Sequence, residues 1–226
     1  MSYTTFIYKK EKAITKKLCS ELMRAFEASH DLQSAGVVGA DGNRNLEKPE
    51  IKKSTDISFD PTFENHPLWG KMLVTVVEAV QRGLIDYGRH FWMGMDCLSP
   101  IVIQPFFNLQ KYGPSEGYVQ MHCERGSSSF PMRTHAWMIY LNDVEEGGQT
   151  EFPYQNLMEE PKAGNLIIWP SDFTHIHRGI PAPNEIKYIL TGWIGFEPDE
   201  GCDPVFNKPF KDLPADKKIK LSSEYE

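Results

Sequence analysis

A histidine and a glutamate stand one residue apart in the stretch YVQMHCERG, residues 118–126. If this stretch is extended, alternate side chains point to the same side, so His122 and Glu124 project together and Cys123 points away. An imidazole and a carboxylate arranged in this way can bind one metal ion. The triplet is equally compatible with the polar edge of a strand, so the choice between the two interpretations depends on a third ligand.

Six further histidines are available as that ligand: His30, His66, His90, His135, His175 and His177. The first three fall in a part of the chain with helical patterning, and His135 precedes an apolar run that resembles a strand. His175 and His177 follow the apolar run NLIIWP at 165–170. Two histidines with one carboxylate leave three neighbouring coordination positions open, as in non-heme Fe(II) oxygenases, whereas structural zinc normally takes four protein ligands. The sequence offers no fourth ligand.

Two kinds of pattern divide the chain. Apolar residues recur at helical spacing over 11–29, and a second helix is predicted near 67–87, with Pro67 in its first turn. Residues 30–62 between them are rich in Gly, Asn, Asp and Lys, which predicts a loop. From residue 101 onward, short β-branched and aromatic runs alternate with turn residues, as is typical of an all-β sandwich or barrel.

We therefore predict a mostly β fold with helices covering one face of the β core. The chain of 226 residues is expected to form a single domain. Its parts would be a helical N-terminal part (1–98), a β core (about 100–197) and a charged C-terminal extension (198–226).

Composition restricts the partners and the compartment. The net charge of −7 argues against a nucleic-acid partner, because phosphate binding needs a basic surface. No apolar run is long enough to cross a bilayer, and the first residues do not have the pattern of a secretory signal. The four cysteines are scattered without a CxxC pair, which favours reduced thiols. These features predict a cytoplasmic protein that does not contact a membrane.

Several motifs in a fixed order resemble those of the Fe(II)/2-oxoglutarate-dependent dioxygenases, in the prolyl-4-hydroxylase-like branch. They are the His-x-acid pair at His122 and Glu124, the segment YLNDVEEGGQTEFP at 140–153, and His177 ten residues before Lys187. The resemblance covers roughly residues 100–196. It implies a double-stranded β-helix, the jelly-roll or cupin-like core. It also implies Fe(II) bound by His122, Glu124 and His177, with His175 outside the ligand set. The expected cosubstrates are 2-oxoglutarate and O2, with ascorbate as an additional cofactor.

Lys187 shares one strand face with Ile189, Thr191 and Trp193 by period-two counting. A buried ammonium needs a counter-charge, and the resemblance supplies one in the distal carboxylate of 2-oxoglutarate. Further candidates for contacting this cosubstrate are Thr191, Tyr118, Tyr112 and Asn108. For Asn108 the other interpretation is a solvated sheet surface. Three more residues are candidates for substrate contact or for support of the site: Arg178, His175 and Arg133.

One position departs from the family pattern. The usual acid is aspartate, whereas this chain has Glu124, whose arm is one methylene longer and could change the placement of the metal or allow bidentate binding. The resemblance implies hydroxylation of a C–H bond, with a peptidyl proline as the favoured substrate and with release of succinate and CO2. Two alternatives stay open: hydroxylation of a free amino acid or other small molecule, and a non-catalytic jelly roll that binds a metal or ligand.

Overall fold

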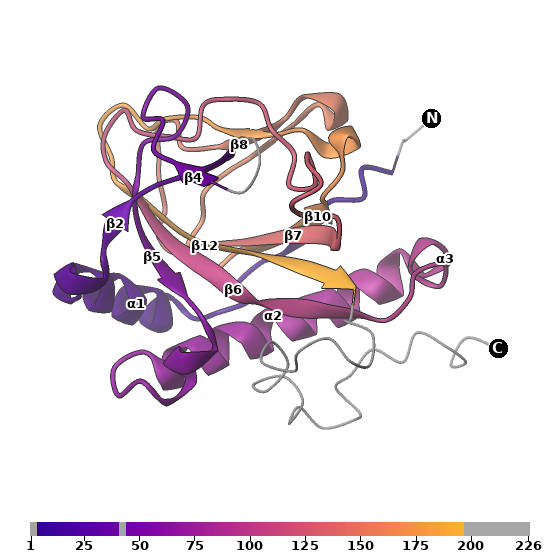
Figure 1. Ribbon diagram of the computed structural model, residues 1–226, viewed down its shortest axis with the longest axis horizontal. Helices are drawn as coiled ribbons and strands as arrows, with labels where there is room; N and C mark the ends of the chain where they lie inside the picture. Colours follow the sequence, from indigo (N-terminus) through magenta and orange to yellow (C-terminus); the bar gives the residue numbers. More distant parts are fainter. Residues whose placement is uncertain (1–3, 41–43, 197–226) are drawn as a thin grey trace.

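The computed structural model describes residues 4–40 and 44–196 and is built around a large antiparallel sheet (Figure 1). The sheet has seven strands in the order β1-β10-β7-β12-β6-β5-β2. In that order they are β1 (Tyr8–Lys10), β10 (Leu166–Pro170), β7 (Arg133–Tyr140), β12 (Lys187–Phe196), β6 (Ile101–Tyr112), β5 (Thr55–Phe59) and β2 (Ser34–Ala35). The predicted C-terminal extension, 198–226, lies outside the described residues.

A second, smaller sheet lies on the other side of the β core. It consists of β11 (Arg178–Gly179), β8 (Thr150–Phe152) and β9 (Leu157–Glu159), in that order. A separate hairpin joins β3 (Val38–Ala40) to β4 (Arg44–Leu46). In Figure 1, β8 and β4 lie above the large sheet and the helices lie below it. The predicted mostly β architecture with flanking helices is confirmed.

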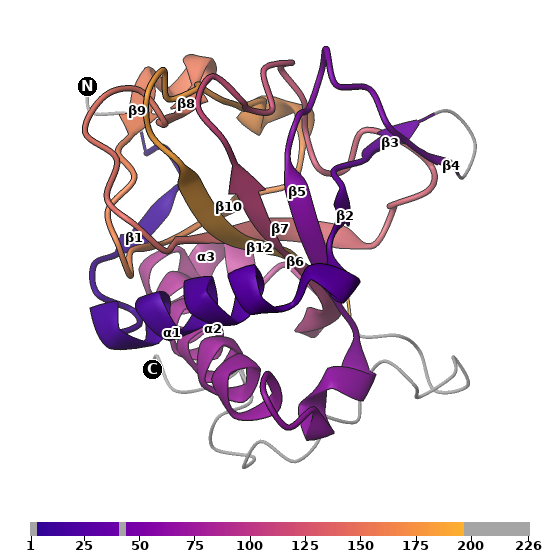
Figure 2. The same ribbon diagram turned by 90° about the vertical axis from the view of Figure 1, so that its left-hand side faces the viewer.

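Two long helices cover one face of the large sheet (Figures 1 and 2). Helix α1 (Lys16–Ala28) begins after Thr15, whose side chain accepts a hydrogen bond from the backbone N–H of Leu18, as expected of an N-cap. Helix α2 (Gly70–His90) is followed by the short α3 (Trp92–Met95). Among the described residues, none of the helices combines the length and the apolar character needed to span a bilayer.

The second helix starts three residues later than the sequence predicts. Residues before it form the 3-10 turn η2 (Pro61–Asn65), and His66 ends that turn. The Nδ1 atom of His66 accepts hydrogen bonds from the backbone N–H groups of Leu68 and Trp69, at 3.2 and 3.3 Å. These contacts satisfy N–H groups before the first helical turn, so Pro67 lies in the approach to the helix rather than inside it.

The described part of the region predicted as a loop, 30–62, contains four strands and the 3-10 turn η1 (His30–Leu32). The most important of these strands is β5, which pairs with β6 and places Ile57 opposite Leu109. Ile57 and Phe59 are almost fully buried. The expectation of an unstructured loop is therefore wrong for this region, because two alternating apolar residues in a five-residue strand are too few to stand out from the polar residues around them.

Side chains of the large sheet alternate between two environments. On the helix side, Leu190 and Ile194 of β12 pack with Trp137 of β7 and Leu109 of β6 in one apolar cluster. On the opposite side, Ile189 packs with Met138, Tyr140 and other residues inside the β core. This alternation places the odd-numbered residues of β12 from Lys187 to Trp193 toward the interior between the two sheets.

Candidate metal centre

His122 and His177 are held side by side by their backbones. The segment between β6 and β7 that contains His122 is not a regular strand, but it forms an isolated antiparallel bridge with His177. The backbone N–H of His122 donates to the carbonyl of His177 at 3.0 Å, and the reverse bond measures 2.9 Å. The N–H groups of Glu124 and Arg125 both donate to the carbonyl of Ser171. Backbone pairing thus fixes the segment that contains His122 and Glu124 against the segment that contains His177.

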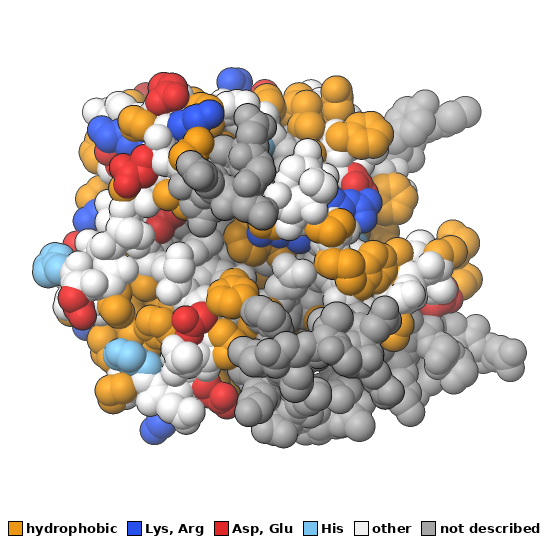
Figure 3. Space-filling model, viewed as in Figure 1, with side chains coloured by type: hydrophobic (Ala, Val, Ile, Leu, Met, Phe, Trp, Pro, Cys, Tyr) orange, Lys and Arg blue, Asp and Glu red, His pale blue; other side chains and the backbone are white. Residues whose placement is uncertain are grey.

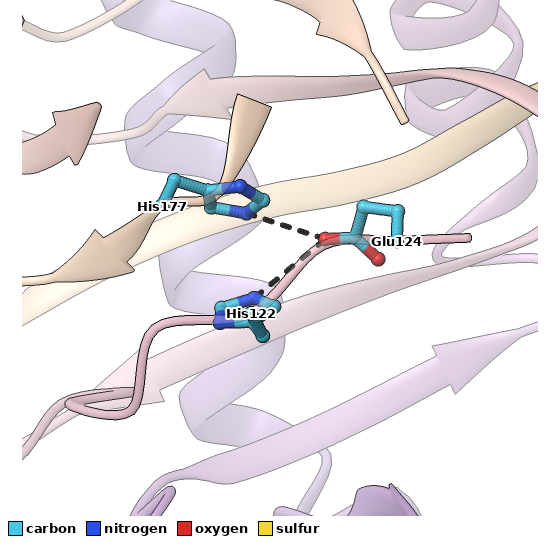
Figure 4. Close-up of side chains that lie close together, drawn as sticks. All are labelled: His122, Glu124 and His177. Atoms are coloured by element: carbon cyan, nitrogen blue, oxygen red, sulfur yellow. Dashed lines mark ion pairs between the residues drawn. The ribbon is translucent and has the colours of Figure 1, made fainter. Parts of the chain in front are cut away.

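The three side chains converge at one point (Figure 4). Glu124 Oε1 lies 3.4 Å from His177 Nε2 and 3.8 Å from His122 Nε2. One candidate ligand atom from each residue lies within 4.8 Å of the other two. Such a spacing of two imidazole nitrogens and one carboxylate oxygen suits a single divalent cation.

Each imidazole is oriented through its other nitrogen. His122 Nδ1 lies 2.9 Å from the carbonyl of Gln120, and His177 Nδ1 lies 3.0 Å from the carbonyl of His175. A carbonyl can only accept, so Nδ1 carries the proton in both rings and Nε2 presents its lone pair toward Glu124. The ring of His122 also stacks on Tyr118, with centroids 3.7 Å apart.

The protonation states suit metal binding. Burial lowers the pKa of His122 to about 4, and the neighbouring His177 acts in the same direction. Burial opposes ionisation of Glu124, but the close imidazoles of His177 and His122, together with the indole N–H of Trp193, outweigh it and lower the pKa of this carboxyl to about 2. At neutral pH His122 is neutral and Glu124 is ionised, which are the forms that bind a cation. The donor set therefore fits Fe(II).

The three side chains line a cavity of about 1110 Å³. Lys187 also lines it, and this side chain is almost fully buried. Its Nζ donates to the carbonyl of Gly148 at 3.0 Å and lies 5.2 Å from the centre of the Tyr112 ring. Burial lowers the pKa of Lys187 to about 8. Within residues 4–40 and 44–196, no carboxylate pairs with this ammonium, so the cavity contains a cation without a counter-charge.

The other cosubstrate candidates also reach the cavity, but several of their polar groups are already bonded. All four of them line it: Asn108, Tyr112, Tyr118 and Thr191. The hydroxyl of Thr191 donates to the carbonyl of Trp137, and the hydroxyl of Tyr112 donates to Gln110. Asn108 Oδ1 accepts a hydrogen bond from Ser58.

The structure separates the three candidates for substrate contact or support. Arg133 lines the cavity, whereas Arg178 and His175 do not. Arg178 Nε donates to Glu151 at 2.6 Å on the small sheet. His175 Nε2 donates to the carbonyl of Thr5, so its side chain contacts the N-terminal segment, and only its backbone carbonyl contacts His177.

Many cavity residues were not among the predicted site residues, and Trp193, Lys52 and Asp56 are three of them. Trp193 donates from its indole Nε1 to Glu124 Oε2 at 2.7 Å. Trp193 lies six residues after Lys187 in the same strand, so alternation places both side chains on one face, and this pattern could have identified Trp193 as a site residue. Lys52 and Asp56 form a buried ion pair of 2.6 Å that also lines the cavity. They belong to the region predicted as a loop, where no sequence pattern indicated a buried pair.

Comparison with known proteins agrees with this geometry. Residues 107–195 match the model of the 2OG-Fe(II) oxygenase superfamily. This segment, somewhat under half of the chain, is therefore similar to 2OG-Fe(II) oxygenase domains. It contains β7, most of β12, part of β6 and all three converging side chains, and the resemblance predicted from the motifs is confirmed.

Two curated plant proteins are similar in sequence to part of this chain. A probable prolyl 4-hydroxylase 9 of Arabidopsis thaliana is 27% identical over 110 residues, covering 39% of this chain and 33% of that protein. Prolyl 4-hydroxylase 13 of the same plant is 25% identical over 114 residues, covering 39% of this chain and 42% of that protein. The matches thus span well under half the length of these relatives.

Solved structures share the fold over most of the chain. A prolyl hydroxylase from Trichoplax adhaerens, in complex with a hypoxia inducible factor peptide fragment, has a TM-score of 0.68 and 17% identity, covering 85% of this chain and 84% of that one. A viral collagen prolyl hydroxylase from Paramecium Bursaria Chlorella virus-1 has a TM-score of 0.59 and 18% identity, with coverages of 85% and 97%. A Pseudomonas putida prolyl-4-hydroxylase has a TM-score of 0.60 and 17% identity, with coverages of 86% and 95%. The predicted jelly-roll core is confirmed.

Proposed function

We propose that this chain is an Fe(II)- and 2-oxoglutarate-dependent dioxygenase that hydroxylates a C–H bond of its substrate and releases succinate and CO2. One observation carries the proposal. The cavity that contains the convergent donors of His122, Glu124 and His177 also contains Lys187, a buried cation without a counter-charge among the described residues. A dicarboxylic oxo acid complements both features, since one end can chelate a metal and the other can neutralise an ammonium.

Different residues bind the metal and the cosubstrate. His122, Glu124 and His177 hold Fe(II), which together with the oxo acid and O2 supplies the oxidising chemistry. Lys187 binds the distal carboxylate of 2-oxoglutarate, and the carbonyl of Gly148 keeps its Nζ oriented. The phenol groups of Tyr112 and Tyr118 are on the cavity wall, and burial raises the pKa of Tyr118 to about 12, so it stays a neutral hydrogen-bond donor. Ascorbate would serve to keep the metal reduced.

For the substrate we favour a peptidyl proline. The relatives and structural neighbours named as prolyl hydroxylases support this choice. The size of the cavity also leaves room beyond a bound dicarboxylate for a peptide side chain. Among the described side chains visible in Figure 3, acidic and basic groups are interspersed and do not form one continuous basic patch. With the acidic net charge, this favours a peptide over a nucleic acid, and we propose that the protein acts in the cytoplasm.

The experiment is succinate formation by purified protein. Fe(II) and 2-oxoglutarate are added without oxygen, air is then admitted, and proline-containing peptides are compared with free amino acids as substrates. We expect succinate release that depends on one class of substrate. His177→Ala should abolish it, because a metal ligand is lost. His175→Ala is the matched control and should have a much smaller effect, since its side chain contacts Thr5.

Two outcomes would contradict the proposal. Iron binding without succinate formation for every substrate class would favour a non-catalytic metal-binding jelly roll. Equal losses in His175→Ala and His177→Ala would show that the ligand is wrongly assigned.

A further inference from the structure

We propose that Trp193, together with Arg133, is a positioning residue that makes Glu124 bind the metal through Oε1 alone. This inference rests on the proposed function and addresses the effect of the longer acidic side chain. A glutamate arm has more rotatable bonds than an aspartate arm, so its carboxylate could approach a cation through one oxygen or through both. The contacts around Glu124 remove that freedom.

The two carboxylate oxygens of Glu124 have different partners. Oε1 is the atom that approaches both imidazoles, at 3.4 and 3.8 Å. Oε2 accepts the indole N–H of Trp193 at 2.7 Å and lies 3.7 Å from Arg133 Nη1. Bidentate binding would require the carboxylate to turn and break a short hydrogen bond to an ionised acceptor, a strong class of hydrogen bond. Oε2 is therefore directed toward the protein and Oε1 toward the metal site.

Arg133 and Trp193 support each other. The guanidinium of Arg133 stacks between two rings, 3.8 Å from the centre of Phe130 and 3.7 Å from that of Trp193. Such cation–π contacts orient a planar guanidinium. Arg133 Nη1 also donates to the backbone carbonyl of Glu124 at 3.2 Å. The arginine thus fixes the backbone of Glu124 while the indole fixes its carboxylate.

The position of Trp193 in the sheet explains why it can reach Glu124. It stands opposite Ala136 of β7, and the pairing of β12 with β6 shifts register between Gly192 and Ile194. A register shift of this kind re-aims side chains locally. The small side chain of Ala136 leaves space on the strand beside the indole. Trp193 is consequently fixed by a strand rather than by a loop, which suits a residue that sets ligand geometry.

This arrangement has a functional consequence. A monodentate carboxylate with two imidazoles occupies three coordination positions and leaves three for a chelating cosubstrate and O2. A bidentate glutamate would occupy one of those positions. Trp193 and Arg133 would therefore allow glutamate to replace the usual aspartate without loss of an open position.

The test is the dissociation constant of Mn²⁺, measured by titration calorimetry on metal-free protein. We expect Trp193→Phe, which keeps the aromatic ring beside Arg133 but removes the N–H donor, to weaken Mn²⁺ binding by about 10- to 100-fold, the usual effect of losing a group that orients a ligand. Trp137→Phe is the matched control. The indole nitrogen of Trp137 is buried and has no hydrogen-bond partner among the described residues, so the constant should not change.

A double-mutant cycle separates positioning from a general structural effect. In Glu124→Asp the carboxylate is withdrawn by about 1.5 Å, one carbon–carbon bond, and no longer reaches the indole. Adding Trp193→Phe to Glu124→Asp should then weaken Mn²⁺ binding by less than about 3-fold. If Trp193→Phe causes the same loss in the wild-type protein and in the Glu124→Asp variant, the inference is overturned.

A measurement on the unaltered protein covers the case in which Trp193→Phe does not fold. With Zn²⁺ added as a diamagnetic probe, the indole N–H of Trp193 should stay protected from solvent exchange, because its bond to Oε2 persists. Rapid exchange in the metal-bound state would contradict the proposal. Failure of the proposed function looks different: the wild-type protein would then form no succinate with any substrate class, whatever the Mn²⁺ affinities of the variants.

Discussion

The two faces of strand β12 perform different tasks with residues that alternate along one segment. Leu190 and Ile194 point toward the helices and are fully buried in apolar surroundings. Lys187, Thr191 and Trp193 point into the cavity, where each has a polar contact. In β12, therefore, side-chain direction rather than position along the chain separates the residues that stabilise the fold from those that line the site. Substitutions one to three residues apart should therefore have opposite consequences.

The largest contrast is expected between Leu190→Ala and Lys187→Met. Leu190→Ala removes a buried side chain from the helix face and should lower the free energy of unfolding by about 2–5 kcal/mol. The requirement of the folded protein for 2-oxoglutarate should not change. Lys187→Met removes a buried ammonium that has no counter-charge from the described residues, so without cosubstrate the stability should be unchanged or higher.

For Lys187→Met the effect appears in cosubstrate binding. Loss of a buried charge pair with the distal carboxylate should raise the required 2-oxoglutarate concentration by about 100-fold or more. Urea unfolding and the 2-oxoglutarate dependence of succinate formation measure the two quantities. Lys111→Ala, on the facing strand, is a suitable control because Lys111 pairs with Glu27 on the helix side. An unchanged cosubstrate requirement in Lys187→Met would remove this residue from its proposed role.

His135 sharpens the comparison because it is a titratable residue on the helix face of β7. Its ring packs edge-on against Tyr87 of α2, with centroids 4.8 Å apart. Burial lowers its pKa to about 4. The nearby His175 also lowers this pKa, whereas the carboxylate of Asp172 raises it. The unfolded state therefore binds more protons than the folded state between about pH 4 and pH 6.5.

Stability should consequently decrease as the pH falls through this window. Across this pH range, protonation of His135 in the unfolded state should lower the free energy of unfolding by about 3 kcal/mol. Burial lowers the pKa of His122 and His175 as well, so all three histidines contribute to the dependence of unfolding free energy on pH. His135→Phe should make the dependence of unfolding free energy on pH shallower, as measured by denaturant unfolding at several pH values. An identical slope in the variant would show that this imidazole is not buried in its neutral form.

Sequence patterns predicted the residues whose positions follow from periodicity or from a long motif. Alternation along β12 placed Lys187 and Thr191 on one face, and the motif order indicated His177 over His175. For Arg178 the sequence left substrate contact and support both open, because tertiary contacts decide between them. Arg178 pairs with Glu151 on the small sheet, away from the cavity.

The region 30–62 shows why part of the site was not predictable. Its polar composition predicts a loop, yet Lys52 and Asp56 form a buried pair that depends on the packing of β5 against β6. Neither residue has a local signal for burial, since lysine and aspartate are ordinarily exposed. The register shift that directs Trp193 toward Glu124 is likewise set by pairing between strands rather than by the sequence of one strand.

The smallest expected effect compares two tyrosines on paired strands. Tyr188 of β12 donates to Glu27 Oε1 at 2.5 Å on the helix side, whereas Tyr112 of β6 donates to Gln110 at 2.7 Å inside the cavity. Tyr188→Phe should lower the free energy of unfolding by about 1 kcal/mol, the typical net contribution of one hydrogen bond, without a change in cosubstrate requirement. Tyr112→Phe should instead raise the 2-oxoglutarate requirement, because the altered group borders the Lys187 ammonium. If both substitutions change stability alone, the cavity face does not differ in function from the helix face at this end of the sheet.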